Sequence, residues 1–183
     1  MENNCNFLQG VCVLQGAVEA YLIERDFYNK DLTEMLPSTK DIKFVPYDTQ
    51  ADETSKVLIN MSRGPISLTN TGILNMPSNM TSGKPSLAII FTISTQNYYL
   101  TEALGIELLQ YLSAISKSIS AFNLNLGQIQ LSETQVQKDT SPHFYVNKIV
   151  VQASIPQVLW KLKSSDDILN SIRTNITFNG QTI

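Results

Sequence analysis

The segment "YYLTEALGIELLQYLSAISKSISAF", residues 98–122, has the clearest helical pattern in the chain. With 100° of rotation per residue, one set of its apolar residues falls within an arc of about 80°. These residues are Leu104, Leu108, Leu112, Ile115, Ile119 and Phe122. The pattern predicts an amphipathic helix that packs this stripe against a core, with Asn97 or Thr101 as its N-terminal cap.

The side of this helix that faces away from the stripe carries few charges. Ile106 lies about 170° from the centre of the stripe and Leu109 about 110° from it. Gly105, Ser113 and Ser116 lie on the side where Leu109 projects. A solvated helix face more often carries Lys and Glu pairs. Three interpretations remain open: another layer of the same domain covers this side, a neighbouring subunit covers it, or it faces solvent.

The segments around the helix have strand patterns. The continuous apolar run "SLAIIFTIS", residues 86–94, predicts a central strand buried on both faces. Alternation in "KVLINMSR", residues 56–63, predicts a strand with one buried face. "IKFVPYD", residues 42–48, contains a proline, which predicts an edge strand or an arm. Residues 127–136 and 144–155 predict an antiparallel hairpin.

The remaining segments complete a fold class. Residues 11–28 predict an N-terminal helix, and residues 166–172 and 175–178 predict a short helix and a last strand. Residues 64–85 contain three prolines and three glycines among scattered apolar residues, which predicts a projecting loop or arm. We therefore expect a single α+β domain over residues 1–183. Its mostly antiparallel sheet would be packed by one long helix and an N-terminal helix, with a long extended loop or arm.

The composition favours contact with other proteins over contact with nucleic acid or membrane. The chain is 16% charged with a formal net charge of −3, and its polarity comes largely from 15 Asn and 12 Gln. The 13 basic residues are scattered, so we expect no direct sequence-specific binding of nucleic acid. No stretch reaches the roughly 18 apolar residues of a membrane helix, so we expect no membrane partner. Amide-rich surfaces lose water at less cost than charged ones, which favours protein contacts. A compositional bias of the source genome would explain the amides equally well.

The residues needed for catalysis are missing from the sequence. His143 is the only histidine, and no G-x-S-x-G motif supplies a nucleophile. Cys5 and Cys12 with one histidine are too few ligands for a structural zinc ion. Glu102 and Glu107 lie about 140° apart on the predicted helix, so they cannot share a site on one face. We expect no enzyme activity, no catalytic residue, no metal site and no cofactor.

The strand "SLAIIFTIS", the helix "LTEALGIELLQYLSAI" and the hairpin ending in "FYVNKIVVQASIPQVLW" resemble, in order and polarity, the tail terminator or tail completion proteins of tailed bacteriophages. The resemblance covers residues 86–160 and leaves residues 30–85 outside it. It implies a virion protein, made in the host bacterial cytoplasm, that forms a homo-oligomeric ring, a hexamer, between the tail tube and the head-side connector. The alternatives are another neck or baseplate component of a virion, or a monomeric soluble protein-binding module.

The resemblance also implies where the contacts with neighbouring subunits and virion proteins lie. On the helix they would be made by Ile106, Leu109 and Ser113. In the loops they would be made by Ile66, Leu68, Ile73, Leu74, Gln135 and Lys138.

Overall fold

The structure is a computed structural model, and it describes residues 7–46, 56–70, 80–138, 143–156 and 158–161. Contacts between residues divide the chain into two compact units. The first unit consists of residues 1–67 and 85–156, and the second of residues 68–84 and 157–183. The expectation of a single domain stays a prediction.

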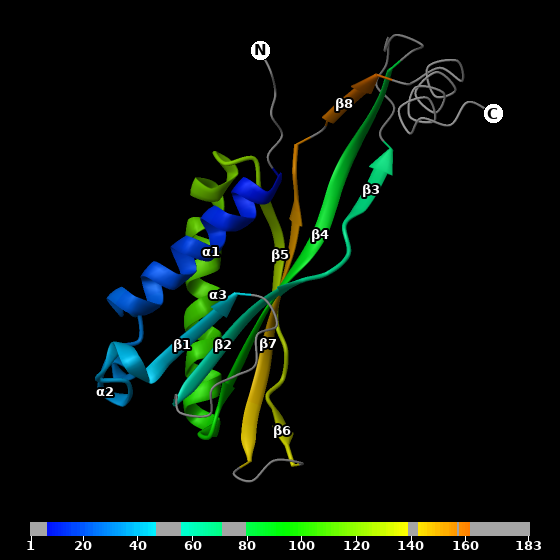
Figure 1. The fold of residues 1–183 in the computed structure, drawn as a ribbon. Coiled ribbons are helices and arrows are strands. Elements are labelled where there is room, and N and C mark those ends of the chain that lie inside the picture. The colour runs from blue at the N-terminus through cyan, green and yellow to red at the C-terminus, as the bar shows by residue number, and fades with distance from the viewer. Residues whose placement is uncertain (1–6, 47–55, 71–79, 139–142, 157, 162–183) are drawn as a thin grey trace, which may run out of the picture. The chain divides into compact units, whose positions relative to one another are not determined.

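The first unit contains a mixed sheet with the strand order β1-β2-β4-β7-β5 (Figure 1). These strands are β1 (Ile42–Pro46), β2 (Val57–Arg63), β4 (Met80–Thr95), β7 (Phe144–Ser154) and β5 (Asn125–Leu131). Of β4, residues 85–95 belong to the first unit. The β1–β2 pair is parallel, and the β2–β4, β4–β7 and β5–β7 pairs are antiparallel. A short strand, β6 (Gln135–Gln137), also pairs antiparallel with β7. The protein is therefore α+β with a mostly antiparallel sheet, as predicted.

The two long helices, α1 (Phe7–Glu24) and α3 (Tyr98–Ser120), lie on the same face of this sheet (Figure 1). Between α1 and β1 the chain forms the short helix α2 (Asp31–Met35) and one 3₁₀ turn, η1 (Thr39–Asp41). The helix predicted over residues 11–28 ends earlier, at Glu24, because Arg25 takes a left-handed backbone conformation with φ of 54°. The predicted cap of α3 is confirmed, since the Asn97 side chain accepts hydrogen bonds from two N–H groups in the first turn.

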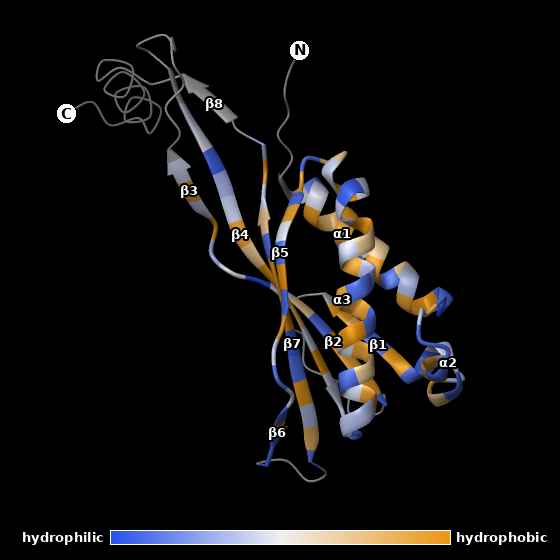
Figure 2. Ribbon diagram, turned by 180° about the vertical axis from the view of Figure 1, so that it is seen from behind, coloured by the Kyte–Doolittle hydropathy of each residue, from blue (hydrophilic) through white to orange (hydrophobic). Residues whose placement is uncertain are grey.

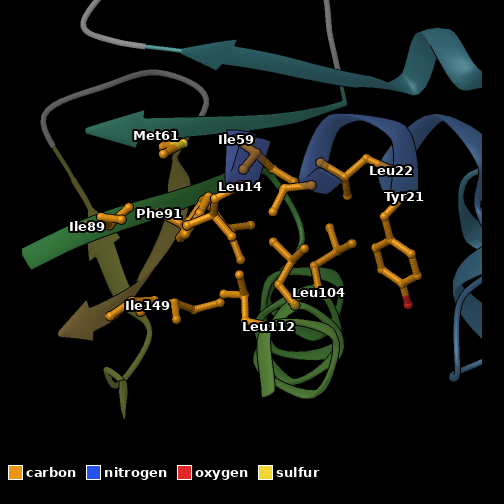
Figure 3. Packing of buried hydrophobic residues seen from close by; sticks show 14 of the residues in the cluster. Leu14, Tyr21, Leu22, Ile59, Met61, Ile89, Phe91, Leu104, Leu112 and Ile149 are labelled. Carbon is orange, nitrogen blue, oxygen red and sulfur yellow. The ribbon is translucent and has the colours of Figure 1, made fainter. Parts of the chain in front are cut away.

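The core lies between the sheet and the two helices. In β4, Leu87, Ile89, Phe91 and Ile93 are all buried, and they alternate with less buried residues. Figure 3 shows Phe91 close to Leu14 of α1 and to Leu104 and Leu112 of α3. Each fully buried side chain of this size stabilises the fold by about 1.5–3 kcal/mol. Most of the predicted helix stripe is confirmed, because Leu104, Leu108, Leu112 and Ile119 are buried.

Two predictions about burial are wrong. The strand over residues 86–94 is fully buried on one face only, because Ala88, Ile90, Thr92 and Ser94 are half-buried. No described helix covers that second face (Figure 2). Phe122 was expected in the core stripe, but its side chain is 43% exposed because α3 ends at Ser120.

The segment 64–85 is less loop-like than predicted. It contains β3 (Ser67–Asn70) and the beginning of β4, which starts at Met80 rather than at residue 86. In the second unit, β8 (Val158–Lys161) pairs antiparallel with Met80–Gly83. Hydrogen bonds from a strand distant in sequence thus override the weak strand propensity of this segment. Residues 71–79, and the elements predicted at 166–172 and 175–178, lie outside the described residues.

Candidate interaction surface

One side of α3 is exposed and almost uncharged. At 100° per residue, five residues on the side opposite the core fall within an arc of about 60°. These residues, called the outer stripe here, are Tyr99, Ile106, Gln110, Ser113 and Lys117. All five are exposed; the Tyr99 side chain is 78% exposed and that of Ile106 is 48% exposed. Only Lys117 is charged, so two of the three predicted helix contacts, Ile106 and Ser113, lie on a surface that is inexpensive to desolvate.

The structure separates the other predicted residues of this helix from the outer stripe. Leu109 is half-buried, and the Ser113 hydroxyl donates to its carbonyl oxygen at 2.8 Å. Gly105 was expected on the outward side but is buried. A Cβ atom at Gly105 would lie 2.6 Å from Asn147 Nδ2 in β7 and 2.9 Å from Leu131 Cδ1 in β5. The side of α3 that carries Gly105 is therefore covered by the sheet of the same chain.

An exposed aromatic group continues the outer stripe at the start of α3. The Tyr98 ring, 45% exposed, packs edge-on against Tyr99 and Tyr145 with centroid distances of 5.7 and 5.8 Å. Val136 of β6, 44% exposed, is the register partner of Tyr145. Tyrosine is enriched at the centre of protein interfaces, which makes this group a natural extension of the contact surface. The sequence could have indicated Val136 as a contact residue, because it is an apolar residue between two glutamines, Gln135 and Gln137.

A side-chain hydrogen bond connects α3 with the approach to β6. The Thr134 hydroxyl donates to the Glu102 carboxylate, and both side chains are half-buried. This contact places the predicted residue Gln135, which is exposed, beside the first turns of α3. Lys138, just after β6, is exposed as well.

The other predicted loop residues, Ile66, Leu68, Ile73 and Leu74, are divided between the two units and the residues that the structure does not describe. Ile66 belongs to the first unit and is 48% exposed. Leu68 belongs to the second unit and is 53% exposed. Ile73 and Leu74 lie outside the described residues. The interface role of all these residues stays a prediction.

The second acidic residue of α3, Glu107, is buried. It is 1% exposed and accepts three hydrogen bonds. The donors are the Tyr21 hydroxyl, the Tyr28 N–H at 2.6 Å and the Asn29 N–H at 2.9 Å. A buried carboxylate is tolerated only when its oxygens are hydrogen-bonded, and here α1 and the segment that follows it supply the donors. Glu107 therefore fastens the N-terminal helices to α3. Glu102 and Glu107 bind different segments of the chain and do not share a site, as predicted.

The aromatic residues around Glu107 form a stack. The rings of Tyr21 and Tyr111 are 3.8 Å apart and nearly parallel, at 7°. Burial raises the pKa of the Tyr21 hydroxyl far above its ordinary value, and the hydrogen bond to Glu107 raises that pKa further. The Tyr111 hydroxyl donates to the Ala17 carbonyl oxygen at 2.9 Å. No local pattern predicts this cluster, because Tyr21 and Glu107 are 86 residues apart.

The described residues give no sign of a metal site. Within them, no group of three or more His, Cys, Asp and Glu side chains is placed to hold a metal ion. His143 is exposed. Among the helices that the structure describes, none is long and apolar enough to cross a membrane.

Comparisons with known proteins give structural likenesses without a matching family. No protein-family model matches the chain, and no curated protein matches it. Among solved structures, the chain is similar to one from the "Virion of native gene transfer agent (GTA) particle". The two chains are 8% identical with a TM-score of 0.36, over 76% of this chain and 95% of that chain. This degree of likeness does not carry an argument about function.

Proposed function

We propose that this chain is a non-enzymatic structural subunit of a phage virion. In this proposal, copies of the chain form a ring that terminates the tail tube and joins it to the connector on the head side. The sequence resemblance over residues 86–160 suggests the family and a ring of six copies. The observation that carries the proposal is the outer stripe of α3, where Ile106 and Tyr99 are exposed beside a single charge.

The second face of the sheet supports the same proposal. On this face Ile90 of β4 is paired in register with Val150 of β7, and both are half-buried. Around them lie mostly uncharged polar residues, such as Thr92 and Gln152. A sheet with helices on one face only leaves the other face for solvent or for a partner. Amide and hydroxyl groups make that face compatible with solvent and with a protein partner. A subunit needs both properties, the first before assembly and the second after it.

The experiment is a comparison of oligomeric state between two matched variants. The wild type should form a ring in size-exclusion chromatography with light scattering and in negative-stain electron microscopy. Ile106→Asp should shift the protein to monomers, because it places a charge in the proposed contact. Ile23→Asp is the control, since Ile23 is a similarly exposed isoleucine of α1, 55% against 48% for Ile106, outside the outer stripe. A wild type that stays monomeric, or a ring that Ile106→Asp leaves intact, would contradict the proposal.

A further inference from the structure

A hollow on the outer side of α1 has a chemistry that the proposed function does not use. It has a volume of about 330 Å³. Three aromatic side chains, Tyr21, Tyr28 and Tyr111, line it together with the carboxylates of Glu24 and Asp26. All of these residues belong to the first unit. The hollow is called the tyrosine pocket below.

Two aromatic walls of the tyrosine pocket, Tyr21 and Tyr111, are held in place before any ligand arrives. The hydroxyl groups of Tyr21 and Tyr111 are bound to Glu107 and to the Ala17 carbonyl oxygen. The stacked rings of Tyr21 and Tyr111 therefore cannot turn away. The Tyr28 ring lies 6.4 Å from that of Tyr21, at 40°, and its side chain is 57% exposed. Fixed walls reduce the entropy that binding would lose.

The charge of the tyrosine pocket is negative and poorly neutralised. Among the described residues, no cation pairs with Glu24, and Asp26 meets only Lys30 at 3.6 Å. Both side chains of that pair are more than three-quarters exposed, at 86% and 77%, so the pair is weak. Arg25 points elsewhere, since it donates to the carbonyl oxygens of Leu36 and Pro37. Glu24 and Tyr111 line the same pocket, and the pKa of Tyr111 is raised by burial and then by the charge of Glu24.

We propose that the tyrosine pocket binds an arginine side chain presented by a protein partner. Aromatic ring faces attract cations, and two carboxylates at the rim would pair with the positive charge. A guanidinium group fits better than an ammonium group, because it is planar, stacks on an aromatic ring and directs several donors at once. This inference does not depend on ring formation.

The binding test uses the full chain and a small probe. Alanine methyl groups are labelled with ¹³C, because Ala17 and Ala20 line the pocket and methyl signals stay visible in large assemblies. N-acetyl-arginine amide should shift the methyl signals of Ala17 and Ala20 and leave that of the buried Ala153 in place. The uncharged analogue N-acetyl-citrulline amide should shift neither. Equal shifts with both probes, or no shift with either, would overturn the proposal.

Variants assign the binding to the named groups. Glu24→Gln and Tyr28→Leu should each weaken binding of the arginine probe about threefold, as expected for one exposed ion pair or one cation–aromatic contact. Glu34→Gln removes an equally exposed carboxylate of α2 that does not line the pocket, and it should leave binding unchanged. The folding control is the Ala153 signal, which should be the same in all variants. Equal binding by wild type, Glu24→Gln and Tyr28→Leu would overturn the assignment.

A third comparison distinguishes a protein partner from the free amino acid. L-arginine carries an ammonium and a carboxylate group that the capped probe lacks. If the pocket serves a protein side chain, L-arginine should bind no more tightly than the capped probe. One additional hydrogen-bonded charge pair would make L-arginine bind more than about tenfold tighter than the capped probe. Such a result would show a site for the free amino acid and would overturn the proposal of a protein partner.

Discussion

Two neighbouring residues of α3 occupy environments opposite to those that their chemistry suggests. Ile106 is apolar and 48% exposed, whereas Glu107 is charged and 1% exposed. They lie about 100° apart around the helix, so one faces away from the domain and the other faces the N-terminal helices. On the inner side the chain satisfies the carboxylate with its own donors. On the outer side nothing described satisfies the apolar surface, which is where a partner would contribute.

The largest effect is expected from removing the Glu107 carboxylate on the side of α3 that faces the N-terminal helices. Glu107→Ala should lower the free energy of unfolding by about 3–4 kcal/mol, because three donors lose a charged acceptor. Glu102→Ala is the matched control on the same helix, and it should cost about 1 kcal/mol or less, because Glu102 is half-buried and accepts one bond. Urea unfolding followed by circular dichroism at low protein concentration measures both. Equal losses in the two variants would mean that Glu107 is no special anchor.

The next test removes one hydrogen-bond donor to Glu107, the Tyr21 hydroxyl, and measures how its contribution to stability depends on pH. Tyr21→Phe should cost about 2 kcal/mol at pH 8, as expected for a hydrogen bond to a charged group. The pKa of Tyr21 is raised above its ordinary value of 10.0, so this contribution is fully present below pH 10. Above pH 10 the unfolded chain releases the Tyr21 proton while the folded chain keeps it, and wild-type stability falls. The difference between wild type and Tyr21→Phe should therefore shrink between pH 9 and pH 11 in urea unfolding. A difference that grows with pH would contradict the assigned hydrogen bond.

A smaller effect is expected where α3 touches the sheet. Gly105→Ala should destabilise by about 1–2 kcal/mol, because the new Cβ atom would displace the Asn147 amide and Leu131. Asn147 is 1% exposed and donates to the Thr101 carbonyl oxygen at 2.9 Å, so it has little freedom to move. Gly16→Ala in α1 is the control, since a Cβ atom there meets nothing within 4 Å. That variant should gain up to about 1 kcal/mol from helix propensity. Thermal unfolding of the pair should show opposite shifts.

The smallest effect on folding should come from the outer stripe. Ile106→Asp should change the free energy of unfolding of the isolated subunit by about 0.5 kcal/mol or less, because the side chain contacts solvent there. The same variant is the one expected to abolish assembly, so a large effect on association would accompany a small effect on folding. Differential scanning fluorimetry of dilute wild type, Ile106→Asp and Ile23→Asp measures the folding part. A substantial loss of stability in Ile106→Asp alone would place Ile106 in the domain core.

Periodicity predicted the parts of this fold that depend on one face of one element. The alternation of Val57, Ile59 and Met61 predicted β2, and the 3.6-residue repeat predicted the buried leucines of α3. Contacts between distant segments escaped prediction. The donors to Glu107 come from residues 78 to 86 positions away. The burial of Gly105 depends on Asn147 and Leu131, and the early start of β4 depends on β8.

The candidate surface, like the fold, could be predicted from the sequence only where it depends on one face of one helix. Helical geometry identified Ile106 and Ser113 as outward-facing, and both are exposed. The same geometry could not show that β5 and β7 cover the side of Gly105, because the position of a hairpin is not encoded in the helix itself. Tyr98 and Val136 join the surface only through the pairing of β6 with β7. The tyrosine pocket likewise needs side chains of α1 and α3, which are far apart in the sequence.

The separation between Tyr21 and Glu107 has a consequence for synthesis of the protein in the cell. Translation proceeds from the N-terminus at about 5–20 residues per second, so Tyr21 is synthesised about 4–17 s before its anchor Glu107. During that interval the apolar side of α1, with Val11, Leu14, Val18 and Leu22, has no core to join. The nascent chain thus exposes the apolar side of α1 early and buries it only after α3 has been synthesised. An exposed apolar helix of this kind is a natural substrate for chaperones.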